Sequence, residues 1–142
     1  MIVDRIAKAL SGLLLFMGVA HFVAPKPFDA IIPKEIPGDP RTLTYASGVA
    51  ELGIGAALLP AKTRRPAAAL ATALFLAVFP ANVNTVRIFV DKSPLLKAVA
   101  WARLPLQIPM IVGALIVWRK SPRPSDVVAP VEAADVETLD AA

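Results

Sequence analysis

Four apolar stretches divide the chain, and the segments between them are short and rich in charge or proline. They cover residues 9–24, 43–59, 67–86 and 98–118. Each is close to the roughly 20 residues that a helix needs to cross about 30 Å of hydrocarbon. Only helices and closed barrels satisfy their own backbone hydrogen bonds in lipid. The pattern therefore predicts an all-α protein, a membrane-embedded antiparallel four-helix bundle formed by residues 1–120.

Two segments outside these stretches have a distinct composition. Residues 25–42 contain five prolines, which excludes one continuous helix. Phe28 and Ile31 make this segment apolar in part, so it is either a surface connector or a cap over a cavity at the mouth of the bundle. Residues 121–142 begin with two prolines and continue as a mixture of alanine, valine and acidic residues without aromatics. This composition predicts a disordered, acidic cytoplasmic tail.

The composition excludes several classes of protein. Hydrophobic residues make up 56% of the chain, against about 45–50% in ordinary soluble domains. There is no cysteine, so disulfides, thiolate metal sites and dithiol relays are ruled out. A single histidine, His21, argues against a self-contained haem or zinc site, and we expect no intrinsic metal.

The charges predict how the chain sits in the membrane. All fifteen lysines and arginines lie at or before Arg123, mostly at the ends of the apolar stretches. With few aromatics among them, they indicate contact with the lipid bilayer and not with nucleic acid. Eight flank the stretches on the amino-terminal side and six on the other side. Since basic residues concentrate in cytoplasmic loops, we predict a multi-pass protein of a bacterial-type inner (plasma) membrane with both termini in the cytoplasm.

Polar residues inside the apolar stretches are the candidates for function. A charged side chain in the middle of a membrane helix costs at least about 2.5–3.5 kcal/mol, so it is a functional hypothesis by default. With helices of alternating direction, all these residues fall in the outer half of the bilayer. They are His21, Glu51, Asn82, Asn84, Arg103 and Gln107. We therefore expect one polar pocket that opens outward beneath the proline-rich segment.

Two interpretations of this pocket stay open. In the first it is a working site, in which Glu51, Arg103 and His21 act in proton transfer. Asn82, Gln107, Asn84 and Ser47 would then bind the ligand. In the second, Glu51 and Arg103 form a buried ion pair that only fixes helix packing. Removal of residues 1–20 as a signal peptide is a further alternative, which we disfavour because it would expose the pocket to lipid.

The chain resembles the DoxX family between Gly12 and Trp118. The resemblance rests on the order and spacing of short motifs, none of them specific alone. These are His21-Phe22, Pro25, Phe28, Ile32-Pro33, Tyr45-Ala46-Ser47-Gly48, Glu51, Leu58-Leu59, Thr63-Arg64, Phe79-Pro80-Ala81-Asn82 and Arg103-Leu104-Pro105-Leu106-Gln107. The resemblance implies a four-helix membrane fold and a role in quinone-linked oxidation or in resistance to oxidative stress.

Two functions follow from these observations. One is a subunit of a quinone-linked oxidoreductase that binds a quinone in the pocket and works with a redox partner protein. The other is a non-catalytic membrane scaffold that docks a redox enzyme through its basic loops or acidic tail. The sequence leaves the oligomeric state open, with a homo-oligomer as one arrangement.

Overall fold

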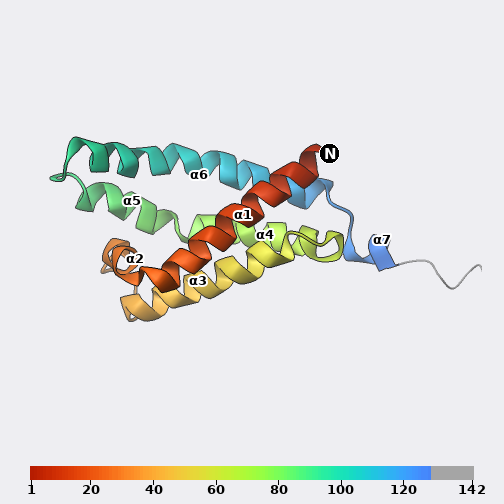
Figure 1. The fold of residues 1–142 in the computed structure, drawn as a ribbon, viewed down its shortest axis with the longest axis horizontal. Helices are drawn as coiled ribbons and strands as arrows, with labels where there is room; N and C mark the ends of the chain where they lie inside the picture. The colour runs from red at the N-terminus through yellow and green to blue at the C-terminus, as the bar shows by residue number, and fades with distance from the viewer. Residues whose placement is uncertain (129–142) are drawn as a thin grey trace, which may run out of the picture.

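The computed structural model describes residues 1–128, which form α-helices and no strand (Figure 1). The prediction of an all-α protein is confirmed for this part of the chain. The helices are α1 (Ile2–Val23), α2 (Pro25–Ile31), α3 (Pro40–Ala57), α4 (Ala61–Ala77), α5 (Phe79–Ile88), α6 (Pro94–Lys120) and α7 (Pro124–Val128).

The long helices run back and forth along the length of the molecule (Figure 1). α1 packs mainly against α3, and α4 packs mainly against α6. Contacts between α1 and α6 and between α3 and α4 join these two pairs. Neighbouring helices run in opposite directions, so that Met1, the α3–α4 turn and the end of α6 lie at one end of the molecule. α2 and the α5–α6 turn lie at the other end.

Three helical segments are long and apolar enough to cross a membrane, judged by length and composition. They are Ile2–Val23, Ala61–Ile88 and Pro94–Lys120, and they correspond to three of the four predicted spans. The fourth, residues 43–59, corresponds to α3, which is not among the three. Charged, hydroxyl-bearing and glycine residues lower the hydropathy of α3. The structure thus supports three membrane-length helices, and the fourth span stays a prediction.

Proline and a capping aspartate set several helix boundaries. Asp39 precedes α3 and its carboxylate accepts a hydrogen bond from the Thr42 backbone N–H at 2.8 Å. The helical conformation is interrupted at Val78, between α4 and α5, immediately before Phe79 and Pro80. Since proline has no N–H to donate, a break at this point costs one hydrogen bond fewer than it would elsewhere.

The proline-rich segment contains a short helix that the sequence did not predict. Pro25 and Pro27 stand in the first turn of α2, where a backbone N–H has no partner in any helix. The helix ends at Ile31, and the chain then turns at Gly38, whose φ of 119° lies in the region that favours glycine. Five prolines therefore exclude one long helix through this segment but not a short one.

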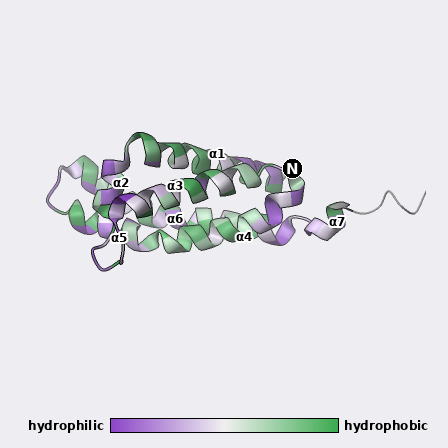
Figure 2. Cartoon of the chain, turned by 90° about the horizontal axis from the view of Figure 1, so that it is seen from below, coloured by the Kyte–Doolittle hydropathy of each residue, from purple (hydrophilic) through white to green (hydrophobic). Residues whose placement is uncertain are grey.

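Most buried side chains are small or polar, whereas many large apolar side chains are exposed. The apolar core consists mainly of alanine and leucine from α1, α4 and α6, such as Ala7, Leu10 and Ala71. Large hydrophobic residues on the outside include Phe16, exposed by 71%, and Trp101, exposed by 62%. In Figure 2 apolar residues run along the middle of the molecule, and hydrophilic residues are most frequent towards its two ends.

The carboxyl-terminal segment is partly helical where the structure describes it. Residues 121–128 were expected to begin a disordered tail, but Pro124–Val128 form α7, which contacts α4. Ser121 is buried, and its carbonyl oxygen accepts a hydrogen bond from Arg65 at 3.1 Å. The predicted tail boundary at residue 121 therefore lies too early, while residues 129–142 fall outside the described part of the chain.

Candidate functional site

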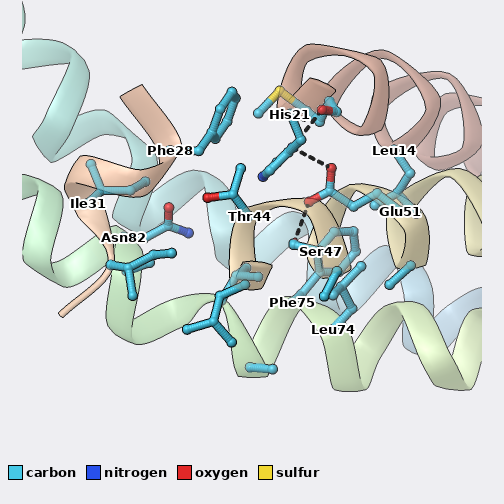
Figure 3. A pocket seen from close by; sticks show the side chains of 18 of the residues that line it. Leu14, His21, Phe28, Ile31, Thr44, Ser47, Glu51, Leu74, Phe75 and Asn82 are labelled. Atoms are coloured by element: carbon cyan, nitrogen blue, oxygen red, sulfur yellow. Dashed lines mark hydrogen bonds and ion pairs between the residues drawn. The ribbon is translucent and has the colours of Figure 1, made fainter. Parts of the chain in front are cut away.

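A cavity of about 640 Å³ lies inside the molecule near the end that holds α2 (Figure 3). Its walls come from α1, α2, α3, α4, α5 and α6, and most of the lining side chains are apolar. Ile31, Ile32 and Phe28 of the proline-rich segment are among them. This segment therefore covers the cavity, as one of the two interpretations of the sequence expected. Of the seven predicted site residues, five line the cavity: His21, Ser47, Glu51, Asn82 and Arg103.

The first polar group in the cavity joins α1 to α3. His21 and Glu51 are both buried, and Nδ1 of the imidazole lies 3.2 Å from Oε2 of the carboxylate. Ser47, one turn before Glu51, donates its hydroxyl hydrogen to Oε1 at 3.2 Å. The carboxylate thus lies between the hydroxyl and the imidazole, as the dashed lines in Figure 3 show. A serine nucleophile needs its base next to the hydroxyl, so this order does not fit acyl transfer.

The histidine has a defined tautomer and one ring nitrogen left for a ligand. Nδ1 lies 2.7 Å from the carbonyl oxygen of Met17, and because a carbonyl only accepts, Nδ1 carries the hydrogen. The imidazole donates this single hydrogen to the carbonyl oxygen of Met17, so Glu51 Oε2 receives no hydrogen bond from the described residues. The ring of Phe28 stacks on the imidazole at 3.8 Å between centroids. Nε2 makes no hydrogen bond within residues 1–128 and faces the side of Thr44 in Figure 3.

The second polar group holds the only arginine on the cavity wall. Arg103 of α6 donates from Nε and Nη2 to Oδ1 of Asn82, at 3.3 and 3.0 Å. Asn82 in turn donates to Gln107 Oε1, and Gln107 donates to the carbonyl oxygen of Phe75 in the last turn of α4. These hydrogen bonds link α4, α5 and α6 around the break at Val78. They hold the guanidinium at the cavity wall and leave some of its five N–H groups for a ligand.

The ion pair between Glu51 and Arg103 that the second interpretation of the pocket required does not form. Among the described residues, no carboxylate oxygen lies within 4 Å of the Arg103 guanidinium, and Glu51 is paired with His21 instead. α3 and α6 each pack against α1 and α4, so they face each other across the bundle. The cavity therefore has a carboxylate on one wall and a cation on another.

Two of the predicted ligand-binding residues do not line the cavity. Gln107 is only 1% exposed, and its amide is fully engaged with Asn82 and Phe75. Asn84 donates to the carbonyl oxygen of Ile31 at 3.0 Å and ties α5 to the end of α2. Both residues hold the walls of the cavity in place. Asn82 lines the cavity, but its amide groups are also used within the protein.

Glycines place the histidine next to the carboxylate. At Gly48 of α3, an added Cβ would lie 2.9 Å from Cβ of His21 and 3.3 Å from the carbonyl oxygen of Gly18. At Gly18 it would lie 3.0 Å from the carbonyl oxygen of Gly48. Ser11 of α1 donates to the carbonyl oxygen of Gly55 at 2.6 Å, further along the same interface. The two backbones can approach this closely only because these residues are small.

Thr44 and Phe28 contribute to the site, although the sequence did not single them out for it. Thr44 lines the cavity, is 2% exposed, and its hydroxyl group lies near the Asp29 carboxylate, whose pKa it helps to lower. An unpaired buried polar group costs about 1–3 kcal/mol, so Glu51 Oε2 favours occupation of the cavity by a polar partner. The helical spacing of Thr44, Ser47 and Glu51 was the available signal. Nothing in the sequence indicated the stacking of Phe28.

No cluster of three or more potential metal-ligating side chains occurs within residues 1–128.

Comparison with known proteins corrects the resemblance stated above. Neither the curated proteins nor the solved structures include a significant match to the chain. No match to the DoxX family is found, so that assignment is wrong. The short motifs behind it were individually common in apolar helices. A family profile described as a domain of unknown function (DUF8561) matches residues 10–118, and the chain belongs to this uncharacterised family.

Proposed function

We propose that the protein is a multi-pass membrane protein in which α3 forms a fourth span with α1, α4–α5 and α6. Three segments have the required length and hydropathy. α3 is polar mainly on the side that faces the bundle, where Thr44, Gly48 and Glu51 are buried. A helix enclosed by its neighbours needs less hydrophobicity than one surrounded by lipid. The exposed apolar side chains on the outside of the molecule support the same arrangement.

The orientation in the membrane follows from the basic residues. The end of the molecule that holds Met1 also holds Lys62, Arg65 and Lys120. We place this end in the cytoplasm of an inner (plasma) membrane. A reporter active only in the cytoplasm, fused after Pro130, should give a signal. A silent fusion there, with an active periplasmic reporter at the same position, would contradict this orientation.

We further propose that the cavity binds a quinone-type ligand, that is, a flat apolar ring with oxygen atoms on opposite sides. The observation that carries this proposal is the placement of two polar groups on different walls of an apolar cavity of about 640 Å³. Arg103 can donate a hydrogen bond to one oxygen. The pair His21–Glu51 can exchange a proton with the other. Most ligand sites have this character, with apolar walls and a few convergent polar groups.

In this role the protein is the ligand-binding component of a redox system. Reduction of a quinone to a quinol consumes two electrons and two protons. We assign the electrons to a redox partner protein, since the chain has no cysteine of its own. One proton reaches the ligand oxygen beside His21 and Glu51 through this pair, and the oxygen at the Arg103 wall takes the second proton from water that enters the cavity. A homo-oligomer is compatible with this role.

Binding of decyl-ubiquinone to the purified protein in detergent tests the proposal. Trp101 lies near Arg103 on α6 but on the outside of the molecule, so its fluorescence also responds to ligand dissolved in the detergent, and only the saturable part of the quenching is taken to report binding. Arg103→Met should weaken binding about tenfold or more, because a hydrogen bond to a charged group contributes about 1.5–3 kcal/mol. Thermal unfolding of the variant is measured in parallel, so that loss of binding can be separated from loss of fold.

Arg119→Met is the matched control. It removes an exposed arginine from the opposite end of the same helix and should leave binding unchanged. Quenching that does not saturate, or that is equal in wild type and Arg103→Met, would overturn the proposal.

A further inference from the structure

We propose that the cavity selects the reduced, hydroxyl-bearing form of its ligand, the quinol, over the quinone. This inference rests on the proposed function and specifies which redox state the site prefers. It follows from the hydrogen-bonding capacity of the two polar walls. One wall presents acceptors, the other presents donors, and only a ligand with O–H groups satisfies both.

The acceptor wall is formed by His21 and Glu51. Met17 fixes the hydrogen of the imidazole on Nδ1, so Nε2 of the neutral ring carries a lone pair and accepts a hydrogen bond. Glu51 Oε2 is buried and receives no hydrogen bond from the described residues. Oε1 of the same carboxylate already accepts a hydrogen bond from the hydroxyl of Ser47. This wall therefore offers two acceptors that the protein does not satisfy.

The donor wall is formed by Arg103. A guanidinium has only donors, and Arg103 uses two of its nitrogens on a single oxygen of Asn82. No carboxylate oxygen within the described residues lies at ion-pair distance from it. A ligand oxygen with free lone pairs is the partner that this wall lacks.

The two walls discriminate between the two forms of the ligand. Both oxygens of a quinone only accept hydrogen bonds, so a quinone can satisfy Arg103 but leaves Nε2 and Glu51 Oε2 without a donor. It also places its second oxygen against a carboxylate, which is unfavourable. A quinol oxygen can accept from Arg103, and the hydroxyl at its other side can donate to Nε2 or Oε2.

The binding test compares three ligands of the same shape on the full chain in detergent, without oxygen. They are decyl-ubiquinol, decyl-ubiquinone and the dimethyl ether of decyl-ubiquinol, which keeps the ring and the tail but has no O–H. We expect the quinol to bind at least about tenfold more tightly than the other two, as one hydrogen bond to a charged acceptor allows. Equal affinity for all three would overturn the inference but leave the proposed function standing. Absence of binding by all three would overturn both.

A variant and its control test whether Glu51 causes the preference. Glu51→Gln replaces an acceptor by an amide, which can donate through its NH2 group. The advantage of the quinol over the quinone should then fall several-fold, even if both affinities change. Glu35→Gln makes the same chemical change at an exposed position of the segment between α2 and α3 and should leave the preference intact. A preference that survives in Glu51→Gln would contradict the role given to this wall.

The single histidine allows a direct test that does not depend on affinity. With 15N-labelled histidine, every imidazole signal comes from His21. We expect the spectrum of a neutral ring with the hydrogen on Nδ1, and a shift of the Nε2 signal when the quinol binds but not when its dimethyl ether binds. A ring with the hydrogen on Nε2 would remove the acceptor and overturn the inference.

Discussion

At the end of the molecule that holds Met1, Arg64 joins three segments of the chain, whereas at the other end six helices enclose a cavity. Arg64 Nε and Nη2 donate to the carbonyl oxygens of Leu58 and Leu59 at 3.0 and 2.7 Å, and Nη2 lies 3.1 Å from Asp4 Oδ1. The two carbonyls that directly follow α3 are thus paired with the side chain of Arg64. At the cavity, by contrast, Glu51 keeps an unpaired oxygen atom.

This difference shows how one small bundle divides stability and binding between its ends. The polar contacts of Arg64 stabilise the fold because they are made within the protein, although the buried hydroxyl of Ser121 at the same end is also unpaired. The unpaired groups in the cavity cost stability until a ligand or water occupies it. Variants at the Arg64 end should therefore change stability without changing binding, and variants at the cavity end should change binding.

The largest effect is expected at the glycine contact between α1 and α3. Gly48→Leu should lower the free energy of unfolding by about 3 kcal/mol, because its side chain would overlap His21 and Phe22 and force the two helices apart. It should also abolish quinol binding, since His21 would move away from Glu51. Chemical denaturation in detergent and fluorescence quenching measure the two effects.

Gly53→Leu is the control for this substitution. Gly53 lies on the same helix, and an added Cβ there would meet no atom within 4 Å. Its stability and binding should both stay close to wild type. If Gly48→Leu were as well tolerated as Gly53→Leu, the close approach of α1 and α3 would not matter for the cavity.

An intermediate effect is expected from Arg64. Arg64→Met removes three polar contacts of a side chain that is 16% exposed, and should lower the free energy of unfolding by about 1–2 kcal/mol. Quinol binding by the folded protein should stay within twofold of wild type. Lys62→Met, an exposed residue of the same helix, serves as the control. A binding defect in Arg64→Met would show that the two ends are coupled.

The smallest effect is expected from the ion pair that holds α2 against α3. The hydrogen bond from Arg41 at 2.8 Å lowers the pKa of Asp29 below its ordinary value of 3.8. A carboxylate with a lowered pKa in the folded state contributes stability above the ordinary value, and this contribution is lost as the pH falls through the folded pKa. Asp29→Asn should therefore reduce the melting temperature slightly at pH 6, and less at pH 3.

The control for Asp29 is Asp91→Asn, which removes an exposed carboxylate from the α5–α6 turn. The difference between wild type and Asp29→Asn should shrink on acidification, whereas Asp91→Asn should show no such trend. A difference that is constant from pH 6 to pH 3 would mean that the ion pair contributes nothing to stability.

The sequence was sufficient to predict the helical class, and five of the seven residues that it singled out line the cavity. Long apolar stretches mark helices whatever their neighbours are. Glu51, His21 and Arg103 were identified because charged or polar residues in such stretches need a polar environment. Their convergence followed from counting residues along helices of alternating direction.

The sequence was not sufficient to predict which polar groups pair with each other. Glu51 was matched with Arg103 because of their opposite charges, but Gly18 and Gly48 let α1 approach α3 and bring His21 closer. The pairing depends on interhelical distances of a few tenths of an ångström, which no pattern of residues specifies. For the same reason Gln107 and Asn84 could not be recognised as residues that hold the walls.

The length of α6 has a consequence for how a ligand reaches Arg103. A helix of 27 residues is about 40 Å long at 1.5 Å per residue, which exceeds the roughly 30 Å of hydrocarbon. In the proposed membrane arrangement its first turns, with Lys97, stand among the lipid headgroups of the outer leaflet. Arg103 follows six residues later, only about 9 Å deeper. An amphiphile in the outer leaflet already carries its oxygen atoms near this depth and its tail below. It can meet the guanidinium by moving sideways in the bilayer, without crossing towards the midplane.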